Sequence, residues 1–121
     1  MISMKNTEKY GRGIFSTRAI KKDELIEEAP VIIIPKIEWD RMRESILLNY
    51  IFHWGENKAL ALGYGSLYNH SYTPNARYAR NIENNSIEFY AREDIQEGEE
   101  ITVNYNGDPE DRSPLWFEVI E

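Results

Sequence analysis

Closely spaced turn-forming residues divide this sequence into short segments, and this spacing constrains the fold more than any other feature. No apolar run is longer than four residues, and the run at residues 31–34 lies between Pro30 and Pro35. A membrane-spanning helix needs about 20 apolar residues, so none is expected. Short runs bounded by turns are typical of strands. The pattern therefore predicts a mainly β domain of short strands.

Strands are predicted where apolar residues are β-branched or alternate with polar ones. Short apolar runs at 14–15 and 25–26 follow turns, and residues 31–34 are mostly β-branched. Residues 87–91 and 101–104 alternate between apolar and polar side chains, as in a strand with one buried face.

One segment predicts a helix. Trp39, Met42 and Ile46 recur at three- and four-residue spacing, and the helix is expected to begin just after Pro35. Residues 49–52 either continue this helix or begin a strand, because their periodicity fits both.

Composition narrows the class of protein. The chain has 121 residues, no cysteine, two histidines and a formal charge of −7, which suits one domain and excludes cysteine-ligated metals, disulfides and thiol chemistry. The negative charge argues against direct nucleic-acid binding, which needs a basic face. It favours a cationic partner such as a lysine-rich peptide, or simply keeps the protein soluble. Residues 1–9 are polar and lack the core of a signal peptide, so a cytoplasmic protein is expected.

Three segments carry candidate chemistry. The first is Tyr-Gly-Arg-Gly-Ile-Phe at residues 10–15. Its two glycines allow a tight turn or a close approach of backbone to ligand. A dinucleotide fingerprint is excluded because the third glycine and a preceding buried strand are missing. Taken alone, the two glycines indicate a plain turn rather than a ligand-binding loop.

The second and third segments each contain one residue of interest. Residues 67–75 are rich in turn formers and contain His70, which is too far from His53 for metal-ligand spacing, so no metal site is expected. Residues 98–105 predict a strand that ends at Tyr105. Taken singly, His70 is more simply a structural histidine and Tyr105 an aromatic at the edge of the core.

The order and spacing of these three segments together resemble those of a known family. The segments Gly-x-Gly-Ile-Phe at 11–15, Asn-His-Ser-x-x-Pro-Asn at 69–75 and Gly-Glu-Glu-Ile-Thr-x-x-Tyr at 98–105 resemble the SET domain, a family of protein-lysine methyltransferases that use S-adenosylmethionine. The small size without cysteine-rich flanks is similar to the minimal viral and bacterial members.

The resemblance covers most of a single domain, 1–121, with a core at about 10–108 and a C-terminal tail at 109–121. It implies small curved β-sheets with one or two short helices. It also implies a knot-like crossing, in which the C-terminal segment passes under a loop of the preceding chain.

The resemblance also implies residue roles. Tyr105 matches the catalytic tyrosine, and either Trp116 or Phe117 would cover the adenine of the cofactor. The implied cofactor-binding residues are Tyr10, Arg12, Gly13, Asn69, His70, Tyr105 and Trp116, several of them through backbone groups. The implied lysine channel contains Tyr64, Tyr78 and Val103, and Val103 matches a position that helps set the number of methyl groups added.

Two positions depart from the family pattern. Asn104 stands where many members have an acidic residue, and Tyr72 stands where many have cysteine. No metal is expected, and the C-terminal tail or a second copy in a homodimer would complete the substrate channel. The resulting hypothesis is S-adenosylmethionine-dependent methylation of lysine in a basic or histone-like protein. The main alternative is a non-catalytic, acidic binding module for a basic partner, and a weaker one is a structural subunit of an oligomer.

Overall fold

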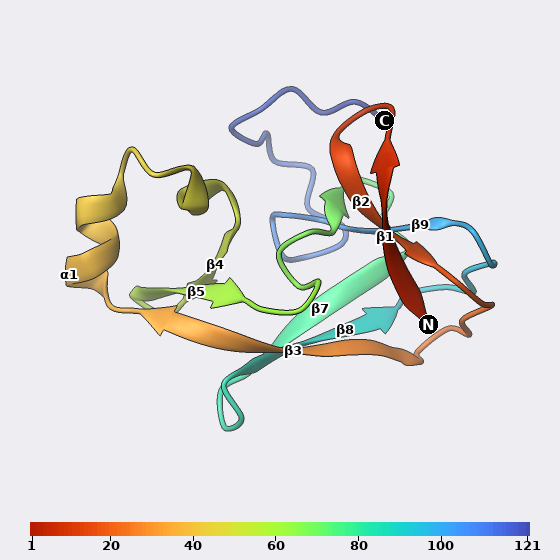
Figure 1. The fold of residues 1–121 in the computed structure, drawn as a ribbon, viewed down its shortest axis with the longest axis horizontal. Coiled ribbons are helices and arrows are strands. Elements are labelled where there is room, and N and C mark those ends of the chain that lie inside the picture. Colours follow the sequence, from red (N-terminus) through yellow and green to blue (C-terminus); the bar gives the residue numbers. More distant parts are fainter.

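The computed structural model describes all residues 1–121, and nine strands form two sheets (Figure 1). The first sheet has the order β1 (Ile2–Thr7), β2 (Gly11–Ser16), β9 (Glu100–Val103), β6 (Asn69–His70). The second sheet has the order β4 (Ile51–Trp54), β5 (Asn57–Ala61), β3 (Leu25–Ile34), β8 (Ser86–Ala91), β7 (Ala76–Asn81). The predicted mainly β fold is confirmed.

The core comes from the alternating segments. On β8, Ile87, Phe89 and Ala91 are fully buried, and on β9 Ile101 and Val103 are buried. Alternate side chains of a strand point to opposite faces of the sheet, so these residues face the core together. Strands β8 and β9 thus confirm the strands predicted at 87–91 and 101–104.

The long strand β3 holds the second sheet together. Its first half pairs with β8 and its second half, residues 31–34, pairs with β5. The runs predicted at 25–26 and 31–34 thus lie at the two ends of a single ten-residue strand.

The predicted helix begins where expected but is short. Helix α1 (Lys36–Trp39) follows Pro35, and the 3₁₀ turns η1 (Asp40–Met42) and η2 (Ile46–Asn49) continue the segment. None of these elements contains a buried residue, so no core contact extends the helix. Ser45 is extended and its hydroxyl accepts a hydrogen bond from the Leu47 N–H, which starts η2 separately. No helix here is long and apolar enough to cross a membrane.

A strand precedes the glycine pair, but it is not the buried strand that a dinucleotide fingerprint requires. Strand β1 pairs with β2 along its whole length, from Ile2 opposite Ser16 to Thr7 opposite Gly11. It is an edge strand with exposed polar residues in its middle, so it lacks the apolar alternation that sequence analysis detects.

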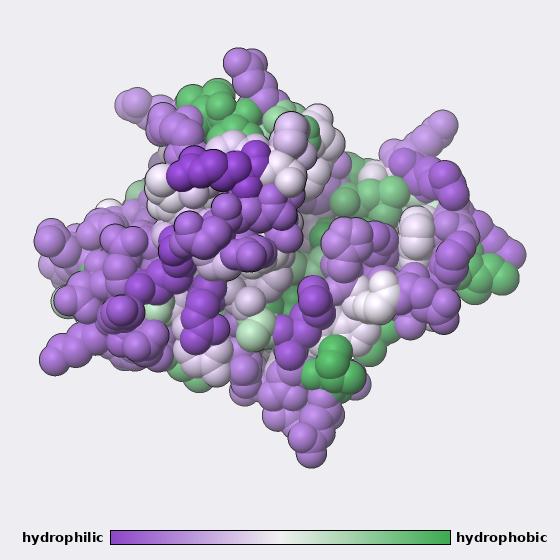
Figure 2. Space-filling view, turned by 180° about the vertical axis from the view of Figure 1, so that it is seen from behind, coloured by the Kyte–Doolittle hydropathy of each residue, from purple (hydrophilic) through white to green (hydrophobic).

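The C-terminal strand β9 lies between β2 and β6, antiparallel to the first and parallel to the second. It therefore brings the N-terminal glycine segment next to the segment at 69–75. The chain after β9 loops away from the sheet and ends beside the turn between β1 and β2 (Figure 1), where the Ile120 N–H donates to the Tyr10 hydroxyl oxygen at 2.5 Å. This order agrees with the expected crossing of the C-terminal segment, while the threading itself stays a prediction. The face that lies behind the view of Figure 1 is mostly hydrophilic, with scattered apolar groups (Figure 2).

Candidate active site

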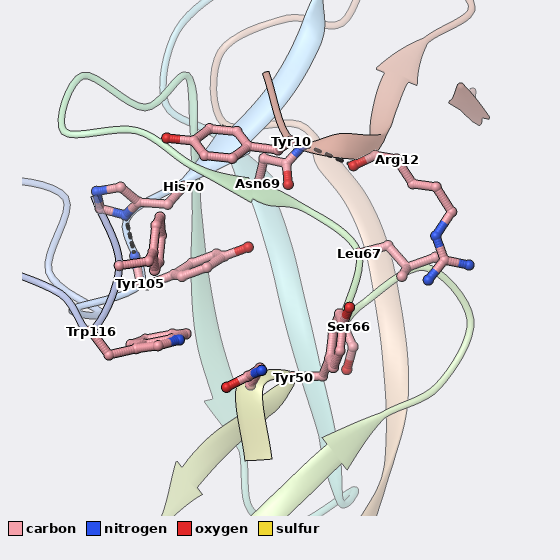
Figure 3. Close-up of a pocket in the computed structure, with 11 residues that line it drawn as sticks. Tyr10, Arg12, Tyr50, Ser66, Leu67, Asn69, His70, Tyr105 and Trp116 are labelled. Atoms are coloured by element: carbon pink, nitrogen blue, oxygen red, sulfur yellow. Dashed lines mark hydrogen bonds between the residues drawn. The ribbon is translucent and has the colours of Figure 1, made fainter. Parts of the chain in front are cut away.

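Two adjoining cavities lie between the two sheets and the C-terminal segment. The first is about 220 Å³ and the second about 600 Å³. The first is lined by Tyr10, Arg12, Asn49, Tyr50, Ser66, Leu67, Asn69, His70, Tyr105, Trp116 and Phe117 (Figure 3). The residues that line both cavities are Asn49, Tyr50, Ser66, Tyr105 and Trp116. Tyr105 thus lies where the two cavities meet.

Tyr105 is held at this junction by three contacts. Its backbone N–H donates to Nδ1 of His70 at 3.0 Å, and its hydroxyl donates to the carbonyl of Tyr68 at 2.6 Å. Its ring stacks on Trp116 with the ring centres 5.9 Å apart and the planes 13° from parallel. The hydroxyl position is therefore fixed by β6 and the residue before it on one side and by the C-terminal tail on the other.

The Tyr105 hydroxyl stays protonated at neutral pH. Burial raises the pKa of Tyr105 well above its usual value, and burial also raises the pKa of Tyr78. Neither phenol can therefore act as a base near pH 7, but the Tyr105 oxygen can still accept a hydrogen bond from an amine.

Asn69 is positioned by Gly13. The Asn69 side-chain amide donates to the carbonyl of Arg12 at 2.9 Å and to the Glu100 carboxylate at 2.8 Å. A Cβ at Gly13 would lie 2.9 Å from the Asn69 amide nitrogen and 2.5 Å from the Glu100 carboxylate. Gly13 does not line the cavity; its missing side chain makes room for Asn69, which does.

His70 is neutral and has a defined tautomer. Its Nδ1 accepts the hydrogen bond from the Tyr105 N–H, so the ring proton lies on Nε2, which is buried and has no hydrogen-bond partner. Burial lowers the pKa of His70, which is only 3% exposed. The structural interpretation of His70 is supported, because its ring positions Tyr105. His70 also lines the first cavity, and its role in cofactor binding stays a prediction.

The C-terminal tail closes one side of the first cavity. The Tyr10 hydroxyl donates to the Ile120 carbonyl at 3.1 Å, and the Glu121 carboxylate accepts from the Ser71 hydroxyl and the Tyr72 N–H. Phe117 packs edge-on against Tyr10 and His70. Trp116 remains 62% exposed although it stacks on Tyr105.

Asn104 ties this tail to β9. The buried Asn104 amide donates to the carbonyls of Asp111 at 2.6 Å and Pro109 at 3.4 Å. Its oxygen accepts from the Asn106 N–H. A carboxylate at this position could not donate, so asparagine in place of the acidic residue of many family members has a local structural reason.

The second cavity contains two of the three residues predicted for a lysine channel. Val103 and Tyr78 line it together with Tyr105. Tyr64 lines neither cavity: it is 37% exposed, and its N–H donates to the Glu27 carboxylate at 2.9 Å. The structure therefore gives Tyr64 no place in the channel, because the turn at 62–65 faces Glu27.

Several residues that line the second cavity had no signal in the sequence. Tyr50 follows η2, Phe52 and His53 lie on β4, Lys58 lies on β5 and Arg80 lies on β7. The segment 49–52 had no decisive periodicity. No sequence signal placed the hairpin of β4 and β5 beside Tyr105.

Comparisons with known proteins agree with this geometry. The family model described as the SET domain matches residues 11–106. A histone-lysine N-methyltransferase of Schizosaccharomyces pombe, named as specific for H3 lysine-37, is 36% identical over 119 residues, which are 97% of this chain and 77% of that protein. A variant-silencing SET domain-containing protein of Plasmodium falciparum is 32% identical over 87% of this chain, which spans only 5% of that protein.

A solved structure is also similar. The crystal structure of a candidate histone methyltransferase of Plasmodium falciparum superimposes with a TM-score of 0.71 and 36% identity, over 89% of this chain and 99% of that one. None of these relatives is viral or bacterial, so the likeness to minimal members of those groups stays a prediction. The matches extend from β2 through Tyr105, and the chain belongs to the SET-domain family of protein-lysine methyltransferases.

Proposed function

We propose that this protein transfers a methyl group from S-adenosylmethionine to a lysine side chain of a protein substrate. The observation that carries the proposal is the place of Tyr105, whose half-buried ring lines both cavities. A cofactor in the first cavity and a lysine in the second would meet at this residue.

The first cavity fits the polar end of such a cofactor. Arg12 is the one Lys or Arg among the residues that line it, and no Asp or Glu lines it. Arg12 is in none of the ion pairs of the structure. The Arg12 guanidinium lies beside Leu67 (Figure 3) and is free to pair with the carboxylate of a methionine group.

The other side of the first cavity fits a flat apolar group. His70, Tyr105 and Trp116 lie together on the side opposite Arg12 and Leu67 (Figure 3). Aromatic walls of this kind stack on planar ligands, so we place the adenine here, against Phe117 or Trp116.

The second cavity would take the lysine. Val103 is 1% exposed and the Tyr78 ring packs edge-on against Phe52, so the wall next to Tyr105 is apolar and aromatic. An apolar channel disfavours the charged ammonium form of lysine, whose reference pKa is about 10.4. The substrate is therefore expected to react as a neutral amine.

When bound, S-adenosylmethionine supplies a methyl group made reactive by the positive sulfonium. The lysine, its ammonium proton lost to water beforehand, would supply the nitrogen lone pair for this methyl group, and the leaving group would be the neutral thioether S-adenosylhomocysteine. The protein supplies alignment. The Tyr105 oxygen orients the amine, and the Tyr68 carbonyl, which accepts from that hydroxyl, adds a dipole at the same place.

We propose a basic, histone-like protein as the substrate class. The chain carries a formal charge of −7, which attracts cationic partners over a distance, and one relative is named as a histone H3 methyltransferase. The same charge also favours the alternative of an acidic binding module without catalysis.

Two measurements on the wild-type protein separate these functions. Calorimetric titration with S-adenosylmethionine should give a heat of binding, and the ligand should raise the melting temperature by mass action. Mass spectrometry of a lysine-rich peptide incubated with protein and cofactor should show added methyl groups. Peptide binding without cofactor binding or methyl transfer would support the binding module instead.

A further inference from the structure

Two cations without carboxylate partners line the second cavity. Lys58 lies on β5 and Arg80 on β7, and both line the cavity that contains Tyr105. The four ion pairs of the structure involve neither of them. A free cation at a substrate cavity is available to bind an anion on the substrate.

The Lys58 ammonium is held in place by neutral groups. His53 lies opposite Lys58 in the pairing of β4 with β5, and Lys58 Nζ donates to His53 Nδ1 at 2.9 Å. The ammonium also lies 4.9 Å from the centre of the Trp39 ring, a favourable cation–π geometry. These contacts fix the position of the charge without cancelling it.

The same histidine links Arg80 to Lys58. A guanidinium N–H of Arg80 donates to the His53 carbonyl at 3.4 Å. Burial and the two nearby cations lower the pKa of His53, which is therefore neutral near pH 7. The group of His53, Lys58 and Arg80 thus carries two positive charges.

One carboxylate lines the same cavity. Asp108, on the segment after β9, is exposed and accepts from the Glu110 N–H at 2.9 Å. With two cations and one anion, the cavity is net positive although the whole chain has a charge of −7. The negative charge of the whole chain therefore attracts a basic substrate over a distance, while the positive charge of this cavity favours an acidic group on that substrate at close range.

We propose that Lys58 and Arg80 bind a carboxylate side chain, Asp or Glu, that flanks the target lysine of the substrate. The inference rests on the proposed function, because it assumes that a substrate lysine occupies the second cavity. The two cations come from different strands, and a carboxylate between them would gain two charge-assisted hydrogen bonds. Lys58 and Arg80 are specificity residues in this account and take no part in methyl transfer.

A peptide series tests this directly. Each peptide has one lysine in a neutral background, with Glu at one of the three positions on either side, and a matched peptide has Gln at that position. Methyl transfer is followed by mass spectrometry, and kcat/KM is compared between the Glu and Gln members of each pair. The wild type should prefer Glu at one or two positions by about 3- to 30-fold, the range expected for two partly exposed ion pairs.

Variants assign the preference to the two residues. In the double variant Lys58→Gln, Arg80→Gln the ratio of Glu to Gln peptide should fall to about one, and in Arg80→Glu an Arg-flanked peptide should become the preferred one. Lys58→Arg should retain the preference. Lys22→Gln is the matched control, because Lys22 is exposed and lines neither cavity; its ratio should equal that of the wild type.

The outcomes separate the two proposals. Equal rates on Glu and Gln peptides, or a preference that survives the double variant, would overturn the role of Lys58 and Arg80 while leaving methyl transfer intact. Absence of methyl transfer to every peptide would overturn the proposed function, and this inference with it.

Discussion

The hydroxyl of Tyr105 donates a hydrogen bond of 2.6 Å to the backbone carbonyl of Tyr68, 37 residues earlier in the chain. The Tyr68 side chain is itself 2% exposed, and its hydroxyl donates to the Glu27 carboxylate at 2.7 Å on β3. The position of the Tyr105 oxygen is thus fixed by a residue that belongs to the core. A site whose reactive groups are held by packed residues meets the demand of methyl transfer for alignment.

Arg12→Gln should weaken binding of S-adenosylmethionine, because it removes the one cation that lines the first cavity. Loss of a charged hydrogen bond costs about 1.5–3 kcal/mol, which corresponds to about a 10- to 150-fold higher Kd. Calorimetric titration measures the change. Arg41→Gln is the control, since Arg41 is exposed and lines neither cavity, and its Kd should match the wild type. Equal Kd values for Arg12→Gln and the wild type would mean that Arg12 contributes backbone groups alone.

Asn104→Asp should destabilise the protein. Asn104 is 2% exposed and its amide donates to two carbonyls of the tail, so a carboxylate would face acceptors with no proton to give them. The expected loss in the free energy of unfolding is about 1–3 kcal/mol, measured by urea denaturation at pH 7.5. Asn84→Asp, at an exposed turn, should change stability by less than about 0.5 kcal/mol. A stable Asn104→Asp variant would show that the tail does not depend on this amide.

Turnover should rise with pH from about 7 to 9, since the substrate lysine must lose its proton before it reacts. Neither the phenols nor His53 is a base for that step, because burial raises the pKa of Tyr105 and Tyr78, and Nδ1 of His53 accepts from Lys58. The Asp108 carboxylate is exposed and already accepts from the Glu110 N–H. Rates at saturating cofactor and peptide give the profile. A rate that is already constant below pH 7 would indicate a dedicated base and contradict proton loss to water.

Local patterns in the sequence predicted the strands whose side chains alternate between core and solvent. Strand β8 and strand β9 are of this kind, and both lie where predicted. Strand β1 was missed because its middle is exposed on an edge, and the hairpin of β4 and β5 was missed because residues 49–52 fit two periodicities. Strand β6 has only two residues and exists through its pairing with β9, which is a long-range contact.

The residues of the candidate site could be predicted where they belong to a sequence motif, and the other residues could not. Asn69, His70 and Tyr105 lie together around the first cavity, although spacing alone assigned none of them. Tyr64 belongs to the same stretch of sequence but lies outside both cavities, because the turn directs its backbone to Glu27. Lys58 and Arg80 come from separate strands that meet only in the folded sheet, so no motif includes them.

The most direct test of the account compares Tyr105→Phe with the wild type in both cofactor binding and methyl transfer. The substitution removes one hydroxyl and keeps the ring that stacks on Trp116, so the Kd for S-adenosylmethionine should change little. The rate of methyl transfer to a lysine peptide should fall by about 10²–10³, the scale for losing one positioned group. Asn69→Ala, which removes the amide held by the Arg12 carbonyl and the Glu100 carboxylate, should affect binding first. A wild-type rate in Tyr105→Phe would contradict the catalytic role of Tyr105.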